Sequence, residues 1–223
     1  MNNKTILYYT SNRESLEFEA KVRADIFKRK GDLPIISVSQ KPIDFGENIC
    51  VGEVGHSYIN MFRQILIGAR KATTQYLVMT EADTIYPENY FSFEPAGANS
   101  YRYNNVWIVF KEKIYSYRRK VHFPGAQIIK REYVIKLTQD YLDGGPEWYN
   151  GWITNKDKNG KYKKDVFNSI PFELFGNENA CISFKTGDAM RRGTDVMHGR
   201  ENIKTKLPYW GHIRDIRRKY LNQ

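Results

Sequence analysis

The stretch QYLVMTEADTIYP, residues 75–87, organises the interpretation of the whole chain. Five residues suited to a buried strand, Tyr76 to Thr80, lead directly into two carboxylates, Glu81 and Asp83. Three interpretations fit this pattern: solvated residues that cap the next turn, a coupled acid-base pair, or a site for a divalent cation. Mg²⁺ and Mn²⁺ bind carboxylate and water oxygens and commonly leave their other positions to substrate phosphates.

Strands and helices alternate in the sequence that precedes this stretch. Lys4–Thr10 and Pro34–Ser39 are β-prone and predict strands, while Pro42–Gly55 is rich in turn residues. Apolar residues at helical spacing predict helices over Ser15–Lys30 and Ser57–Ala72, each opened by a serine that can cap it. This order favours a parallel sheet with helices on its faces, in which ligands collect beyond the carboxyl ends of the strands. The two carboxylates lie at that kind of edge.

The second half of the sequence is less regular. Val106–Phe110 and Ile114–Tyr117 predict paired strands, and a helix is predicted over Lys130–Leu137. Residues 143–165 predict a long loop, which in a compact domain is usually functional or mobile. A turn and a basic helix are predicted over residues 203–223.

Length and composition limit the class of protein. At 223 residues the chain is expected to form one domain with a core that needs no disulfide. Cys50 and Cys181 have no metal-type spacing, so we interpret them as free thiols in a reducing compartment, with one disulfide as the alternative. The sequence shows no signal peptide and no apolar run of about 18 residues, so a cytoplasmic protein is expected.

The net charge of +10 is unevenly distributed. Residues 1–110 contain 12 Lys and Arg and 12 Asp and Glu, whereas residues 111–223 contain 23 and 13. Charge distribution bears on partners and solubility rather than on fold. The second half therefore either presents a solvated basic face or meets an acidic partner.

Four segments together resemble glycosyltransferases of the GT-A fold, of the family-2 type. TEADTIYPENYFSFEP, residues 80–95, resembles the acidic DxD-type motif of that family, with Glu81 where the first Asp is usual. TSNR, residues 10–13, resembles the opening turn that contacts the nucleobase. PGAQIIKREYV, residues 124–134, resembles the segment beside the donor sugar, and DVMHGREN, residues 195–202, resembles a late His that completes the metal site. The resemblance spans about residues 4–210.

The resemblance implies a single α/β domain over residues 1–223, GT-A and Rossmann-like, with a mostly parallel central sheet flanked by helices. Residues 1–110 would bind the nucleotide sugar and metal, and residues 111–223 would form a basic acceptor half. The implied cofactor is Mn²⁺ or Mg²⁺, and the donor is a nucleoside-diphosphate sugar. The implied metal ligands are Glu81, Asp83 and His198, and the implied donor-binding residues are Thr10, Asn12, Arg13, Arg63, Gln64, Gly125 and Ala126.

A glycosyl transfer that inverts the anomeric centre needs a base to take the proton of the acceptor hydroxyl. Glu178, in FGNENACISF, is the predicted base, with Glu173 as second choice and a solvated surface carboxylate as the alternative for both. A retaining mechanism would need no such base, and the sequence leaves the stereochemistry open. Asp83 is the other residue predicted to act in catalysis, through the metal.

The basic clusters of the second half stand among aromatic residues, as in YSYRRKVHF, residues 115–123, and IRDIRRKY, residues 213–220. Lys and Arg can neutralise phosphates and aromatic rings can stack on bases. DNA carrying a 5-hydroxymethylated pyrimidine, the substrate of phage-type DNA-modifying glycosyltransferases, is therefore the first candidate acceptor. A cell-surface or capsular glycan is the second. A non-catalytic nucleic-acid-binding module is the competing class, whereas the lack of a P-loop motif disfavours a kinase or nucleotidyltransferase.

Overall fold

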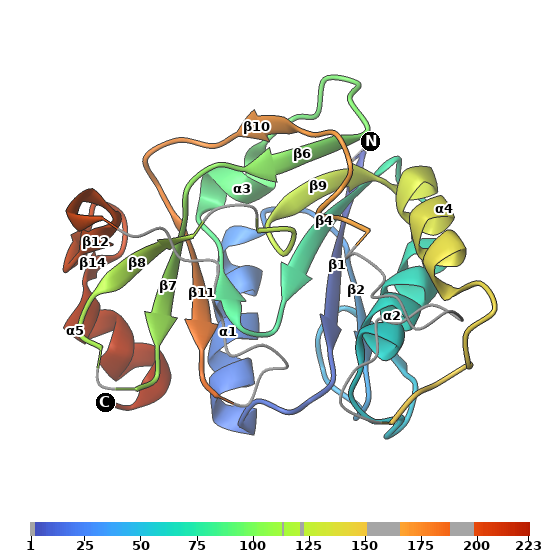
Figure 1. The fold of residues 1–223 in the computed structure, drawn as a ribbon, viewed down its shortest axis with the longest axis horizontal. Coiled ribbons are helices and arrows are strands. Elements are labelled where there is room, and N and C mark those ends of the chain that lie inside the picture. The colour runs from blue at the N-terminus through green and yellow to red at the C-terminus, as the bar shows by residue number, and fades with distance from the viewer. Residues whose placement is uncertain (1–2, 113, 121–122, 151–165, 188–198) are drawn as a thin grey trace.

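The computed structural model describes residues 3–112, 114–120, 123–150, 166–187 and 199–223. Its main feature is a seven-stranded sheet in the order β10-β6-β9-β4-β1-β2-β3 (Figure 1). The strands are β1 (Lys4–Thr10), β2 (Ile35–Ser39), β3 (Glu47–Cys50), β4 (Tyr76–Glu81), β6 (Ser100–Tyr103), β9 (Gln127–Lys130) and β10 (Glu173–Phe175).

The sheet is mostly parallel. Strands β3, β2, β1 and β4 run in the same direction, β9 is antiparallel to both of its neighbours, and β10 runs parallel to β6. The predicted α/β class is confirmed. Four strands of this sheet were not predicted. Strand β3 lies in the stretch interpreted as turns, β9 lies where the sequence indicated only a lead into a helix, and no strand was predicted at β6 or β10.

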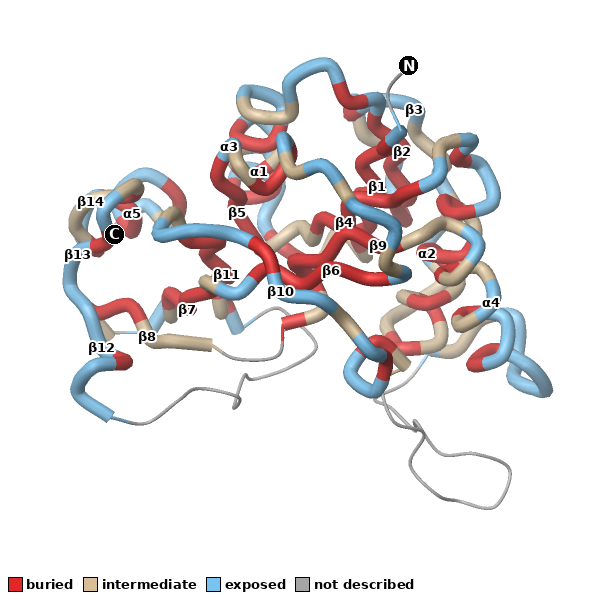
Figure 2. Tube along the Cα trace, turned by 90° about the horizontal axis from the view of Figure 1, so that it is seen from above, coloured by how far each residue is buried: buried red, intermediate tan, exposed pale blue. Residues whose placement is uncertain are grey.

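Helices cover both faces of this sheet. Alternate β1 residues point to opposite faces, so Ile6 and Tyr8 pack in one core cluster with α1 (Leu16–Arg29), and Leu7 packs in another with α2 (Tyr58–Lys71). The helix α4 (Arg131–Leu142) packs beside α2. With both faces covered, β1 is buried along its whole length, as a central parallel strand should be (Figure 2).

The two long predicted helices begin where the sequence indicated. Ser15 accepts a hydrogen bond from Phe18 N at 3.3 Å, and Ser57 accepts one from Asn60 N at 3.1 Å. These caps satisfy amides that the first turn leaves without partners. Because α1 follows β1 and α2 follows β3, both helices start at the edge where the parallel strands end.

A second sheet of five strands, in the order β12-β8-β7-β11-β5, packs beside the first. The predicted pairing of two strands is confirmed as β7 with β8, although β8 lies a few residues later than the sequence indicated. The basic C-terminal helix forms as α5 followed by a π-helical turn. The bounds are β5 (Thr84–Ile85), β7 (Val106–Phe110), β8 (Tyr117–Lys120), β11 (Cys181–Lys185), β12 (Ile203–Lys204), β13 (Lys206–Leu207), β14 (Gly211–His212), α3 (Glu88–Ser92), α5 (Ile213–Ile216) and the π turn Arg217–Leu221.

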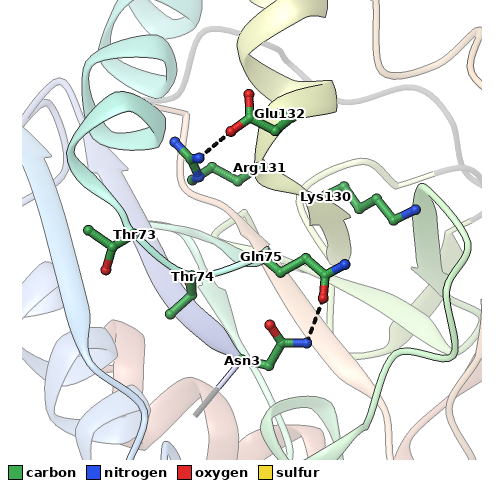
Figure 3. A pocket seen from close by; sticks show the side chains of 7 residues that line it. All are labelled: Asn3, Thr73, Thr74, Gln75, Lys130, Arg131 and Glu132. Carbon is green, nitrogen blue, oxygen red and sulfur yellow. Dashed lines mark hydrogen bonds and ion pairs between the residues drawn. The ribbon is translucent and has the colours of Figure 1, made fainter. Parts of the chain in front are cut away.

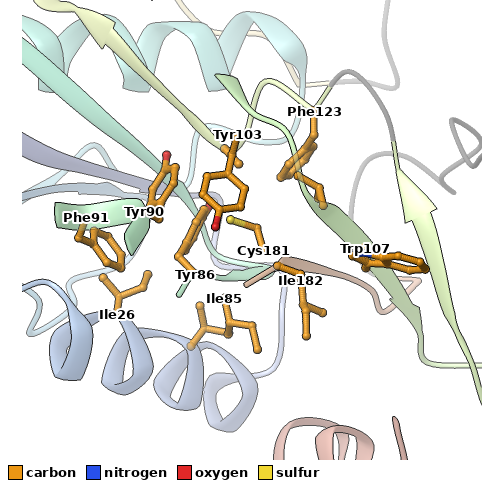
Figure 4. Packing of buried hydrophobic residues seen from close by; sticks show 14 of the residues in the cluster. Ile26, Ile85, Tyr86, Tyr90, Phe91, Tyr103, Trp107, Phe123, Cys181 and Ile182 are labelled. Carbon is orange, nitrogen blue, oxygen red and sulfur yellow. The ribbon is translucent and has the colours of Figure 1, made fainter. Parts of the chain in front are cut away.

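An aromatic cluster joins the two sheets, as Figure 4 shows. Tyr86, Tyr90 and Phe91 are buried together, and Tyr90 Oη lies 2.6 Å from Met79 O and 2.9 Å from Gln127 O. Those carbonyls belong to β4 and β9, so the side chain of Tyr90 links both strands to helix α3.

Cys50 is exposed and Cys181 is buried, and both are free thiols, as predicted. Across the parts of the chain that the structure describes, no helix has the length and apolar character needed to span a membrane.

Candidate active site

The two carboxylates lie where the central strands β1 and β4 end side by side. Tyr9 of β1 pairs in register with Glu81 of β4, and its hydroxyl donates a hydrogen bond to Glu81 Oε1 at 3.0 Å. The parallel pairing therefore brings the end of the first strand against the acidic turn. This is the edge at which open α/β sheets bind ligands.

The backbone around Glu81 is fixed by one buried tyrosine. The hydroxyl of Tyr86 accepts a hydrogen bond from Glu81 N at 2.9 Å and donates one to Gly125 O at 2.8 Å. Figure 4 shows Tyr86 among the buried aromatic residues, with Tyr90 beside it. The segment predicted to lie beside the donor sugar is thus joined directly to the acidic turn.

Gly125 lies so close to Glu81 that a side chain does not fit. A Cβ atom built on Gly125 would lie 2.5 Å from Glu81 Cδ and 2.4 Å from Phe123 Cζ. Such distances are far inside van der Waals contact, so an added Cβ would have to displace the Glu81 carboxylate and the Phe123 ring; glycine serves close approach here rather than an unusual backbone conformation.

We expect Gly125→Ala to displace the Glu81 carboxylate and weaken binding of a nucleoside diphosphate with Mn²⁺ by about 10-fold or more, since a misplaced site loses affinity steeply. Isothermal titration calorimetry measures this effect. The control is Gly145→Ala, where the nearest atom to an added Cβ is Leu142 O at 3.3 Å. Equal losses in both variants would contradict the assignment.

Asp83 is held from two sides. Its side chain accepts a hydrogen bond from Thr84 Oγ1 at 3.0 Å and pairs with Lys185 Nζ at 3.3 Å, while its carbonyl accepts from Phe184 N at 2.7 Å. The side chains of Asp83 and Lys185 are each 12% exposed, so the ion pair is largely but not completely buried. Strand β11 of the second sheet thus helps to build the end of β4.

The carboxylates and lysine perturb one another electrostatically. Burial, and after it the charge of Asp83, raises the pKa of Glu81 to about 7, although Lys120 and Lys185 oppose the shift. Burial by itself would lower the pKa of Lys185, but the carboxylates of Asp83 and Glu81 outweigh that effect and raise it. Two carboxylates held this close leave the site short of positive charge.

The predicted opening turn lies at the same edge and is rigidly tied. Asn12 adopts a left-handed backbone conformation (φ 54°), and its Oδ1 accepts hydrogen bonds from Gln40 N at 2.9 Å and Lys41 N at 2.8 Å. Thr10 Oγ1 donates to Glu19 Oε1 at 2.8 Å. Asn tolerates this conformation better than most residues. Asn12 therefore connects the ends of β1 and β2.

Two other side chains come to this edge from the predicted turn and the loop before α2. Arg13 is half-buried. Burial, and after it the charge of Arg13, lowers the pKa of His56. The Nδ1 atom of His56 is buried and has no hydrogen-bond partner among the described residues. An unpaired buried nitrogen is costly, so it marks a position where a ligand or water would be stabilising.

Arg63 and Gln64 lie on α2 but use their hydrogen bonds within the fold. Gln64 is buried, and its Nε2 donates to Thr10 O at 2.8 Å and to Val38 O at 3.1 Å. Arg63 donates to the carbonyls of Glu147 and Pro146, each at 2.9 Å. Gln64 thus contributes to the site only by its hydrogen bond to the backbone of the opening turn. Arg63 stabilises the segment that follows α4.

The structure does not bring Glu178 to the acid pair. Glu178 is exposed and precedes β11, whereas Asp83 contacts residues at the far end of that strand. A five-residue strand spans roughly 16 Å at about 3.3 Å per residue.

Two further predicted residues remain. Ala126 is buried, and its carbonyl accepts a hydrogen bond from Tyr103 N at 2.9 Å. His198 lies outside the described residues.

The described donor set fits a hard divalent cation in its chemistry. Glu81 and Asp83 offer carboxylate oxygens, and their mutual repulsion would be relieved by a cation between them. Within the described ranges, no group of three His, Cys, Asp or Glu side chains lies together in a way that could hold a metal. Any cation bound by this pair would take its other ligands from water, substrate phosphate or residues outside those ranges.

A pocket of about 610 Å³ lies at the opposite edge of the main sheet, as Figure 3 shows. It is formed where β1 and β4 begin, and Asn3 Nδ2 donates to Gln75 Oε1 at 2.9 Å across it. Arg131 and Glu132 form an ion pair at its rim. The strand direction separates this pocket from the acid pair by the length of β4.

Four residues of the site were not predicted from the sequence: Tyr9, His56, Tyr86 and Lys185. Tyr86 lies within the acidic motif, five residues after Glu81, so a contact with the backbone of the acidic turn could have been expected from the sequence. Lys185 is 102 residues from Asp83, and the two-residue strand β5 that aligns them gives no sequence signal.

No protein-family model matches the chain, and no curated protein matches it. Among solved structures, S. aureus TarS in complex with UDP-GlcNAc is similar with a TM-score of 0.49 and 8% identity, over 87% of this chain and 60% of that one. The mannosyltransferase PcManGT from Pyrobaculum calidifontis, in complex with GDP-Man and Mn²⁺, gives 0.39 and 16%, over 65% and 48%. The bifunctional IspDF from Campylobacter jejuni gives 0.43 and 10%, over 80% and 51%.

The chain thus spans 60% of the TarS chain that it resembles. At these TM-scores the likeness does not carry an assignment of function, which rests on the residues of the site.

Proposed function

We propose that this protein is a glycosyltransferase that moves a sugar from a nucleoside-diphosphate sugar to an acceptor hydroxyl, with Mn²⁺ or Mg²⁺ at Asp83 and Glu81. The observation that carries the proposal is the carboxylate pair at the end of β4, joined to the end of β1 through Tyr9 and to Gly125 through Tyr86. It brings together three segments of the chain that each resemble a motif of GT-A enzymes.

A bound divalent cation would stabilise the negative charge that develops on the diphosphate as it leaves. The chain's own residues then have distinct tasks. Asp83 and Glu81 hold the cation, Asn12 fixes the turn that would receive the nucleobase, and Gly125 leaves room beside Glu81. The Nδ1 atom of His56, which has no hydrogen-bond partner among the described residues, offers a polar contact for a nucleobase at the same edge.

The first candidate acceptor remains a 5-hydroxymethylated pyrimidine in DNA. Support comes from the basic second half and from the basic side chains Arg118, Arg119 and Lys120 on β8, the strand next to β7 in the second sheet. An enzyme acting on such a base would have to take it out of the stack. A cell-surface or capsular glycan is the alternative acceptor.

The stereochemical course depends on which group takes the acceptor proton. Glu178 is exposed and away from the pair, so an inverting transfer through Glu178 would require the acceptor to bridge the length of β11. A retaining transfer has no such requirement. Nuclear magnetic resonance of the first-formed product would decide between the two.

The test is a screen of UDP-, GDP-, CDP- and TDP-sugars for release of nucleoside diphosphate with Mn²⁺ or Mg²⁺, with and without hydroxymethylated DNA. We expect one donor to be hydrolysed slowly alone and much faster with the correct acceptor. Release from no donor, together with salt-dependent DNA binding, would instead favour the non-catalytic nucleic-acid-binding module.

A further inference from the structure

Strand β11 brings a lysine to the acid pair by an exact register. Ser183 pairs with Thr84 in the antiparallel β5–β11 ladder, and Phe184 N donates to Asp83 O at 2.7 Å. Phe184 points into the core, where its ring contacts Phe18 and Tyr220. Because neighbouring strand residues point to opposite faces, the following Lys185 is directed away from that core and onto Asp83.

Lys185 meets an excess of negative charge. It pairs with Asp83 at 3.3 Å, and the carboxylates of Glu81 and Glu14 also act on it. The next residue, Thr186, donates to Glu14 Oε1 at 2.8 Å, which ties the end of β11 to the loop after β1. The lysine is therefore held among three carboxylates contributed by two other segments of the chain.

The ion pair itself is not tightly closed. Charge-assisted hydrogen bonds between ammonium and carboxylate groups are typically about 2.7–2.9 Å long, shorter than the 3.3 Å separation of Lys185 Nζ and Asp83 Oδ2. An ammonium group has three donors. A longer, single contact of this kind leaves donors of Lys185 for a second anion, and its side chain is 12% exposed.

We propose that Lys185 is a phosphate-binding residue. In the free protein it forms an ion pair with Asp83, and once a divalent cation binds the Asp83 carboxylate, Lys185 binds the diphosphate of the donor instead. The inference rests on the proposed function and adds to it a residue that competes with the cation before the donor binds. Lysine is well suited to this exchange, because it is a flexible point charge rather than a planar fork.

The exchange predicts opposite effects on two affinities. In Lys185→Met, binding of Mn²⁺ alone should become about 10-fold tighter, because a positive charge beside the carboxylates is removed. Binding of UDP or GDP at saturating Mn²⁺ should become about 10- to 100-fold weaker, because a charged hydrogen bond to phosphate is lost. Mn²⁺ electron paramagnetic resonance measures the first affinity, and calorimetry measures the second.

Three variants make the result specific. Lys185→Arg keeps the charge and should recover most of the nucleotide affinity, and Lys28→Met, on the exposed side of α1, should leave both affinities unchanged. Thermal unfolding of each variant reports whether it is folded. Both affinities falling together, or nucleotide affinity unchanged in Lys185→Met, would overturn the role of Lys185. If the wild-type protein bound neither UDP nor GDP at any Mn²⁺ concentration, the proposed function itself would fail.

Discussion

Replacing Asp83 by alanine is expected to lower kcat/KM for sugar transfer by about 10³-fold and to abolish Mn²⁺-dependent binding of the nucleoside diphosphate. The loss corresponds to about 4 kcal/mol of transition-state stabilisation, the size expected when the cation on a leaving diphosphate is lost. Asp83 is the larger contributor of the two carboxylates, because Glu81 has a raised pKa and already accepts the Tyr9 hydroxyl.

Asp83→Asn separates charge from shape in this experiment. The amide keeps the size of the side chain and leaves the Phe184 N to Asp83 O hydrogen bond in place, since that bond uses the backbone. Exposed Asp32→Ala serves as the matched control for loss of a carboxylate elsewhere. Wild-type-like nucleotide binding in both Asp83 variants would rule out a metal site at the end of β4.

The second large effect concerns stability without metal. In the presence of EDTA, Glu81→Gln is expected to stabilise the protein by about 2 kcal/mol at pH 8 and to have little effect at pH 4. The pKa of Glu81 is raised from 4.5 to about 7 in the folded protein. The full shift would correspond to about 3 kcal/mol, and we discount it because the side chain is partly exposed to water.

The sign follows from proton binding. Between pH 4.5 and 7 the folded state holds a proton on Glu81 that the unfolded state has lost, so the free energy of unfolding falls as pH rises through this window. Above pH 7 the full cost of the buried charge is present. Urea unfolding at several pH values measures this slope, and exposed Glu88→Gln should not change it. A slope that persists in Glu81→Gln would have to come from other groups.

The long elements of the first half of the fold could be predicted because they obey simple periodicities, whereas its short strands β3 and β6 were missed. The predicted strand at residues 4–10 coincides with β1, and the two capped helices begin at the predicted serines. The second half resisted prediction because its strands are short and their pairing is set by distant partners. Strand β9 enters the main sheet between β4 and β6, a position that local composition does not encode.

The candidate site, too, was predictable where it depends on local sequence and unpredictable where it depends on distant strands. Glu81 is the last residue of β4 and Asp83 follows two residues later, so their position at the sheet edge follows from the direction of the strand alone. Lys185 reaches them only through a ladder of two residue pairs. Glu178 shows the opposite case. Its local sequence suggested a catalytic base, but it precedes β11, whereas Glu81 and Asp83 lie near the other end of that strand.

The β5–β11 ladder also limits how the chain can be divided. Charge changes sharply near residue 110, yet Asp83 before that point depends on Phe184 and Lys185 after it, and Tyr86 depends on Gly125. A fragment ending there would keep β1 to β4 but lose the contacts that shape its acidic turn. Neither piece expressed alone should bind nucleotide, and recovery on mixing would report reassembly of the ladder.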